Sequence, residues 1–218
     1  MKNLIFDYDG TLHNSIKIYA PAFNKAFDFL VEKGFAQKQV LSHKKISYWL
    51  GFSAKDMWDS FMPNLPKEIK DKCSKIIGDE MLRLVKCNKA ELYPDALNVL
   101  HQLKKLGYNL IFLSNCKHTY MEAHKQAFAL DDYFCEFYCT EDYDFKPKYI
   151  IFETIKQKYD GEFIIIGDRF QDMEVAQKFG LKSIGCRYGY GSETELMYAT
   201  YVVNNDYEIS LCVKSMLL

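Results

Sequence analysis

The chain has 218 residues, of which 49% are hydrophobic and 26% are charged. This length suits one domain, or one domain with an insertion, and the composition is that of a folded globular protein rather than a disordered one. With 28 Lys and Arg against 29 Asp and Glu, the formal net charge is −1. Bulk charge therefore attracts the protein neither to nucleic acid nor to an anionic membrane, and we expect neither as a partner.

The seven cysteines are scattered and include no C-x-x-C pair, which indicates reduced thiols. The first apolar run, Leu4–Phe6, is interrupted by Asp7 and is too short for the core of a signal peptide. No later apolar run approaches the roughly 18 residues that are needed to span a bilayer. These features predict a cytoplasmic protein.

Short apolar runs alternate with stretches of helical spacing, which is typical of a parallel sheet covered by helices. One helical stretch begins after Pro94 and ends at Gly107, and a second ends at Gly180. The predicted fold class is α/β, with a Rossmann-like parallel sheet sandwiched by helices. The predicted strands are Leu4–Phe6, Asn109–Leu113, Phe134–Cys139, Phe163–Ile166, Lys182–Cys186 and Tyr201–Val203.

The stretch 16–87 contains no convincing strand and separates the first predicted strand from the second. Its apolar side chains recur at helical spacing, as in Tyr19 and Phe23. We therefore predict an all-helical insertion over 16–87, within an α/β core made of 1–15 and 88–218. Most of the aromatic residues, 16% of the chain, are expected in the core.

Chemically useful side chains follow four of the predicted strands. In chain order they are Asp7, Asp9 and Gly10, then Ser114 and Asn115, then Lys146, and finally Asp168 and Asp172. Each has a structural explanation of its own, as a turn residue, a helix cap or a solvated charge. Because the carboxyl ends of parallel strands form the ligand-binding edge of an open sheet, the whole set indicates a single site.

Several carboxylates in one crevice require a cation. Two of them about 4 Å apart repel by roughly 4 kcal/mol at an effective dielectric constant near 20. Mg²⁺ prefers oxygen ligands and is commonly held by one or two carboxylates together with a substrate phosphate. Lys146, the Ser114 hydroxyl and the backbone N–H groups around Gly10 suit the oxygens of that phosphate. An EF-hand calcium loop is disfavoured, because Gly10 stands at the wrong position in it.

The four segments, in this order, resemble the four motifs of the haloacid dehalogenase superfamily of phosphohydrolases. The helical insertion is similar to the C1 cap of that superfamily, and the tail from Gly185 to Ser192 resembles phosphoglycolate phosphatase-like members. The resemblance implies that Asp7 is the nucleophile and that Asp9 is the general acid and base.

The resemblance also implies a ligand set for the metal and for the phosphate. Mg²⁺ would be held by Asp7, the main-chain carbonyl of Asp9, and Asp168, with Asp172 as a more distant or water-mediated ligand. The phosphate-binding residues would be Gly10, Ser114, Asn115 and Lys146.

Some residues depart from the superfamily pattern or lie outside it. Lys148 and Tyr149 follow Pro147 where a small residue and a proline are common. His13, just after the first motif, either faces solvent or contacts the substrate. His118 and His124 are six residues apart, off the spacing of a helical metal pair, and are expected at the surface.

The predicted function is Mg²⁺-dependent hydrolysis of a small phosphorylated metabolite, a phosphoglycolate-like monoester, through an aspartyl-phosphate intermediate. Three alternatives stay open: a phosphotransferase of the β-phosphoglucomutase type, a pyrophosphatase, and a catalytically silent binding protein. The complete set of catalytic residues argues against the last of these. The physiological substrate and the choice between monomer and homodimer are left open.

Overall fold

The structure is a computed structural model that describes residues 2–216 of the chain. It divides into two compact units. The first unit runs to Asn14 and resumes at Leu92, and the second spans Ser15–Glu91. The strands of the described residues all belong to the first unit, which is therefore the α/β core.

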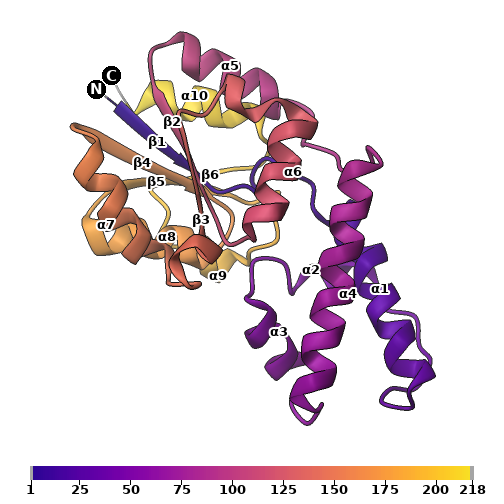
Figure 1. Ribbon diagram of the computed structural model, residues 1–218. Helices are drawn as coiled ribbons and strands as arrows, with labels where there is room; N and C mark the ends of the chain where they lie inside the picture. Colours follow the sequence, from indigo (N-terminus) through magenta and orange to yellow (C-terminus); the bar gives the residue numbers. More distant parts are fainter. Residues whose placement is uncertain (1, 217–218) are drawn as a thin grey trace. The chain divides into compact units, whose positions relative to one another are not determined.

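A six-stranded parallel sheet forms the centre of the first unit (Figure 1). Its strand order, β3-β2-β1-β4-β5-β6, is that of the Rossmann fold, so the predicted fold class is confirmed. The apolar runs of the inner strands reflect burial on both faces of the sheet. The strands are β1 (Lys2–Phe6), β2 (Asn109–Ser114), β3 (Glu136–Cys139), β4 (Glu162–Gly167), β5 (Lys182–Cys186) and β6 (Tyr201–Val203).

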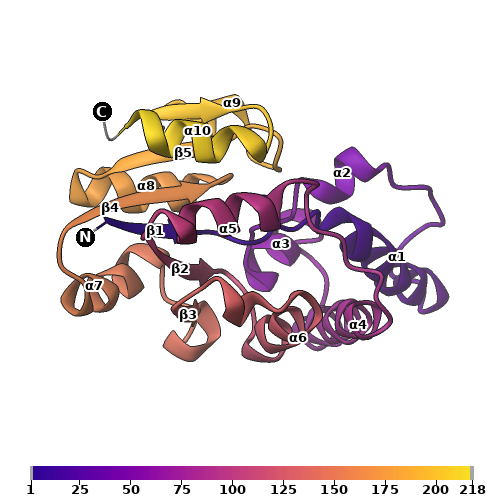
Figure 2. The same ribbon diagram turned by 90° about the horizontal axis from the view of Figure 1, so that it is seen from above.

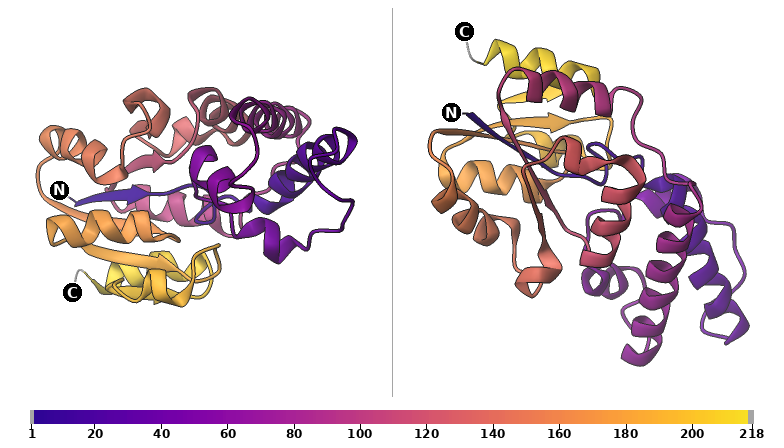
Figure 3. Two further views of the ribbon diagram at one scale, coloured as in Figure 1. Left: turned by 90° about the horizontal axis from the view of Figure 1, so that it is seen from below. Right: turned by 45° about the horizontal axis from the view of Figure 1, so that its top comes forward.

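Helices cover both faces of this sheet. On one face lie α5 (Ala96–Lys105) and α10 (Tyr207–Ser215), which Figure 2 shows from above. On the other lie α7 (Lys148–Lys158) and α8 (Phe170–Phe179), seen from below in Figure 3, left. Strand residues such as Ile165 pack there against helix residues such as Phe152. The remaining elements are α6 (His118–Phe128), α9 (Glu193–Leu196), and the short 3-10 helices η1 (Leu130–Asp132) and η2 (Thr140–Tyr143).

The second unit is helical throughout its regular elements. Its long helices α1 and α4 pack side by side (Figure 3, right). Aromatic side chains fill the space among the helices, and Phe23 stacks on the buried Trp58 with ring centroids 6.3 Å apart. The helices are α1 (Ile16–Glu32), α2 (His43–Ser47), α3 (Ala54–Phe61) and α4 (Lys67–Lys86).

The seven cysteines, all within the described residues, are free. Between residues 2 and 216, none of the helices combines the length and the apolar character that crossing a membrane requires.

Candidate active site

Three carboxylates meet at the carboxyl edge of the sheet. Asp7 follows β1, Asp168 follows β4, and Asp172 lies in the first turn of α8. The Asp7 N–H donates to the carbonyl of Ile166 at 2.8 Å, which holds Asp7 beside the end of β4. One oxygen from each carboxylate lies within 4.8 Å of the others, and all three side chains are buried. Strands β1 and β4 are neighbours where the chain switches sides of the sheet, which is where open α/β sheets bind ligands.

A buried lysine completes this cluster, and it is not the lysine that was predicted. The Lys148 ammonium donates to Asp7 Oδ1 at 2.5 Å and to Asp172 Oδ1 at 2.7 Å. Lys146, the predicted phosphate ligand, is exposed. The cause is local: the residue before a proline is disfavoured in helical conformation, and α7 begins only at Lys148, after its cap residue Pro147. The lysine that contacts Asp7 is thus Lys148, two positions after Lys146.

We call the group formed by Asp7, Asp168, Asp172 and Lys148 the carboxylate cluster. It carries two net negative charges when all four groups are ionised. Burial raises the pKa of Asp168 well above its usual range, and the charges of Asp7 and Asp172 raise it further. Burial also raises the pKa of Asp7, while the Lys148 ammonium opposes this shift. A divalent cation would balance these charges and favour the ionised carboxylates.

The donor set fits Mg²⁺. Asp168 Oδ2 accepts a hydrogen bond from the Tyr190 N–H at 2.6 Å. Asp168 Oδ1 is buried and has no hydrogen-bond partner among residues 2–216. A buried carboxylate oxygen normally has a partner, so this atom is suited to a metal ion that accepts hard oxygen ligands.

Two glycines allow the backbone to approach Asp168 closely. Gly10 has a φ of +90°, and a Cβ atom there would lie only 2.6 Å from Asp168 Cγ. A Cβ on Gly189 would lie 2.6 Å from the Gly10 carbonyl oxygen. The tail segment that contains Gly189 and Tyr190 therefore forms part of the wall around Asp168.

The Gly10 N–H, for which we predict phosphate binding, has a partner within the loop. It donates to the carbonyl of His13 at 2.9 Å. The structure thus explains Gly10 by its backbone conformation and by the space it leaves for Asp168. Thr11, which had no predicted role, donates to Asp7 Oδ2 at 3.3 Å.

The Asp9 side chain contacts two ring side chains. Its Oδ1 accepts a hydrogen bond from the Tyr120 hydroxyl at 2.8 Å and lies 2.9 Å from His13 Nδ1. His13 is fully buried, so the alternative in which it faces solvent is wrong. His124, also expected at the surface, is buried too, whereas His118 is exposed as expected.

Ser114 and Asn115 reach the same edge of the sheet as Asp7. Ser114 is the last residue of β2, the neighbour of β1, and is buried. Asn115 follows it and is half-buried. Their placement suits the phosphate-binding role predicted for them, while the hydrogen bonds to Asp7 come from Lys148 and Thr11.

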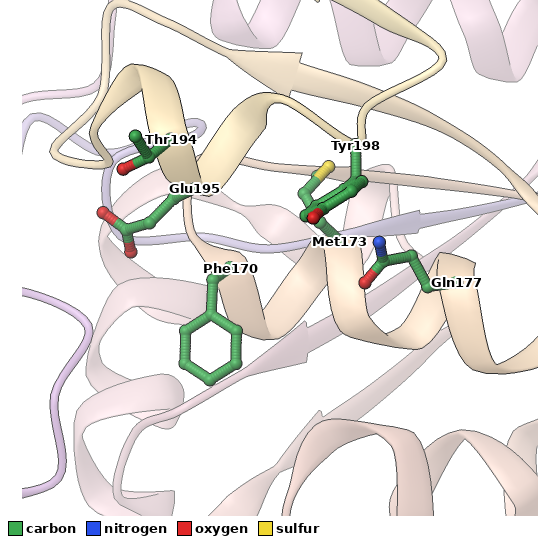
Figure 4. Close-up of a pocket in the computed structure, with 6 residues that line it drawn as sticks. All are labelled: Phe170, Met173, Gln177, Thr194, Glu195 and Tyr198. Carbon is green, nitrogen blue, oxygen red and sulfur yellow. The ribbon is translucent and has the colours of Figure 1, made fainter.

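A separate surface pocket lies between α8 and α9 (Figure 4). It includes none of the predicted site residues, and its Glu195 pairs with Arg169 at 2.9 Å. The lining residues are Phe170, Met173, Gln177, Thr194, Glu195 and Tyr198.

Comparison with known proteins agrees with this geometry. A family model described as haloacid dehalogenase-like hydrolase matches residues 4–186. The phosphoglycolate phosphatase of Pasteurella multocida is 27% identical over 200 residues, covering 85% of each chain. That of Mannheimia succiniciproducens is 26% identical over 200 residues, with the same coverage of 85% of each chain. A solved structure of a predicted phosphoglycolate phosphatase from Haemophilus somnus covers 98% of each chain, with a TM-score of 0.81 and 21% identity, and so shares the fold.

Proposed function

Because this chain belongs to the haloacid dehalogenase-like hydrolase family, we propose that it is a Mg²⁺-dependent phosphatase that hydrolyses a small phosphorylated metabolite through an aspartyl-phosphate intermediate. The observation that carries the proposal is the buried carboxylate cluster at the switch point of the sheet. We propose phosphoglycolate-like monoesters as the substrate class, because the curated relatives are phosphoglycolate phosphatases. The seven free thiols support a cytoplasmic location for this activity.

Asp7 and Asp9 divide the proposed chemistry between them. An oxygen of Asp7 attacks phosphorus, the bond from phosphorus to the alcohol oxygen breaks, and that oxygen takes a proton from Asp9. Water then attacks the aspartyl-phosphate and gives a proton to Asp9. The bond between phosphorus and Asp7 breaks, which releases inorganic phosphate and restores both carboxyl groups.

In this scheme the other residues bind the metal ion and the phosphate and set the charge of Asp7. Asp7, the main-chain carbonyl of Asp9, and Asp168 would hold Mg²⁺, with Asp172 contributing from further away. When bound, Mg²⁺ supplies positive charge that offsets the repulsion between Asp7 and the phosphate. Lys148 favours the ionised, nucleophilic form of Asp7 through its 2.5 Å contact. Ser114 and Asn115 are the proposed phosphate-binding side chains.

The proposal is tested with purified protein, Mg²⁺ and a panel of phosphorylated metabolites that includes phosphoglycolate and pyrophosphate. Both free phosphate and isomerised product are measured. We expect phosphate release from a monoester, and no turnover above the blank for Asp7→Asn, because the amide is not a nucleophile toward phosphorus. Circular dichroism checks that the variant is folded.

Other outcomes would contradict the proposal or indicate a different function. Unchanged turnover by Asp7→Asn contradicts the nucleophile assignment. Isomerised product without free phosphate indicates a phosphotransferase, and turnover of pyrophosphate alone indicates a pyrophosphatase. A folded wild-type protein that converts none of the panel contradicts the enzymatic proposal.

A further inference from the structure

Four aromatic rings form a buried group next to Asp9. This ring cluster consists of Tyr8, His13, Tyr120 and His124, none of them more than 9% exposed. Tyr8 stacks on His13 with centroids 5.3 Å apart, and His124 lies 4.5 Å from His13 and 4.2 Å from Tyr120. Such close packing on all sides fixes the rotamers of the rings.

Two members of the ring cluster reach the same oxygen of Asp9. The Tyr120 hydroxyl donates to Asp9 Oδ1 at 2.8 Å, and His13 Nδ1 lies 2.9 Å from that oxygen. These two groups also lie 3.2 Å from each other. The Tyr8 hydroxyl, in contrast, bonds to His124 Nδ1 at 2.7 Å.

Both of these contacts from the ring cluster thus go to Asp9 Oδ1. Asp9 keeps 17% of its side chain exposed, whereas the His13 side chain is fully buried. Two contacts to Oδ1 restrict rotation of the carboxyl group, and contacts to a charged acceptor are stronger than those between neutral groups. Burial and the nearby Asp9 charge raise the pKa of Tyr120, so its hydroxyl stays protonated and can donate.

We propose that Tyr120 and His13 are positioning residues, which hold the Asp9 carboxyl group in the orientation for proton transfer to the leaving-group oxygen. The inference rests on the proposed function, in which Asp9 is the general acid and base. Tyr120 and His13 contact Asp9, whereas the side chains that contact Asp7 are Lys148 and Thr11. Loss of Tyr120 or His13 therefore affects proton transfer more than nucleophilic attack. Holding a catalytic group within a narrow range of angles is what such supporting contacts contribute.

The test compares two substrates that differ in their need for an acid. An alkyl phosphate loses an alkoxide that must be protonated, whereas p-nitrophenyl phosphate loses a stabilised phenolate. We measure kcat/KM for both substrates in the presence of Mg²⁺, since kcat/KM reports the step in which the leaving group departs. For Tyr120→Phe we expect a fall of about 10- to 100-fold with the alkyl phosphate and of less than about threefold with the aryl phosphate.

A second pair of variants addresses His13. Asn carries a donor near the position of Nδ1, whereas Leu carries none. We expect His13→Asn to keep more of the alkyl phosphate activity than His13→Leu, by about tenfold. Tyr8→Phe is the matched control, since it removes a buried hydroxyl from the same ring cluster but a hydrogen bond to His124 rather than to Asp9. It should leave the ratio of the two kcat/KM values unchanged.

The outcomes separate this inference from the proposed function. Wild-type protein that hydrolyses neither substrate refutes the proposed function, and the inference with it. If the wild type hydrolyses both, equal falls for both substrates in Tyr120→Phe overturn the positioning role alone. The same conclusion follows if Tyr8→Phe changes the ratio as much as Tyr120→Phe does, or if His13→Asn and His13→Leu lose the same activity.

Discussion

The Lys148 ammonium touches two acids of the carboxylate cluster. The Lys148 side chain is 4% exposed, and its ammonium contacts both Asp7 and Asp172. Removing one partner of a buried ion pair leaves an uncompensated charge, at a cost of roughly 3–5 kcal/mol. Lys148 therefore stabilises the folded site and favours the ionised form of the Asp7 nucleophile.

We expect Lys148→Met to lower kcat/KM for a phosphomonoester by at least about 100-fold, because Asp7 loses the charge that holds it ionised and oriented. The matched change two residues earlier, Lys146→Met, removes an exposed lysine and should lower kcat/KM by less than about threefold. Steady-state kinetics of both variants, with circular dichroism for folding, provide the measurement. The reverse order of effects would restore Lys146 as the functional lysine.

The residues of the site differ in how far they could be predicted. Asp7, Asp168 and Asp172 follow predicted strands, so the rule that parallel strands end at one edge was enough to bring them together. The choice between Lys146 and Lys148 depends on where α7 begins, which a proline between two lysines leaves open. The contact of Tyr120 with Asp9 joins residues 111 positions apart, and no local pattern marks it.

At the level of elements, helices α1 and α4 are tied together by a charged group as well as by packing. Glu80 on α4 accepts hydrogen bonds from Lys25 on α1 at 2.7 Å and from Arg83 at 2.6 Å. These hydrogen bonds, that of Arg83 first and that of Lys25 second, lower the pKa of Glu80 to about 2. Because Lys25 and Arg83 are largely exposed, we take the stabilisation as about 1 kcal/mol.

The Glu80 contacts predict a pH dependence of this helical unit. The pKa of Glu80 is lower in the folded than in the unfolded state, where it is about 4.3. The stabilisation is therefore complete above that value and is lost as pH falls toward 2. We expect Glu80→Gln to lower the free energy of unfolding by about 1 kcal/mol at pH 6, and the difference from wild type to shrink at pH 3.

Tryptophan fluorescence during urea unfolding measures this effect in the right unit, since the chain's two tryptophans, Trp49 and Trp58, both belong to it. Asp79→Asn is the control, because it breaks an exposed pair with Lys75 on the same helix. It should change the free energy of unfolding by no more than about 0.5 kcal/mol. A Glu80→Gln effect of equal size at both pH values would contradict the assignment.

The elements themselves were largely predictable. All six predicted strands are present, and those at Lys182–Cys186 and Tyr201–Val203 have the predicted bounds. Their apolar, β-branched runs lie between clear helical stretches, which leaves little ambiguity of period. The third strand is shorter than predicted, beginning at Glu136 rather than Phe134. The Phe134 N–H still donates to the Leu130 carbonyl of η1, and only from Cys135, whose N–H donates to the Leu110 carbonyl of β2, does the chain turn toward the sheet.

At the scale of the whole molecule, the α/β unit holds several negative charges in its buried carboxylate cluster. A bound cation would reduce the repulsion among these charges. A ligand that binds only the folded state stabilises it by about 2.7 kcal/mol at a free concentration about 100 times its Kd. We therefore expect Mg²⁺ to raise the Tm of the protein by several degrees and EDTA to reverse the shift.

Asp168→Asn sharpens this prediction. The change removes one of the repelling charges, so it should raise the Tm measured in EDTA while removing most of the Mg²⁺-dependent shift. Asp131→Asn, at an exposed position of the same unit, should keep the full shift. An Mg²⁺-dependent shift of the same size in Asp168→Asn would rule out this metal site.

The sequence by itself determined the fold class, the order of the elements and the three acids of the carboxylate cluster, because hydrophobic period and strand ends are local properties of the chain. Only the tertiary structure decided which lysine meets Asp7, that Gly10 leaves space for Asp168, and that Tyr120 and His13 meet at Asp9. These contacts depend on where a helix begins and on how α6 packs against the loop after β1. Packing between distant segments of the chain determines these contacts, and no residue spacing along the sequence encodes that packing.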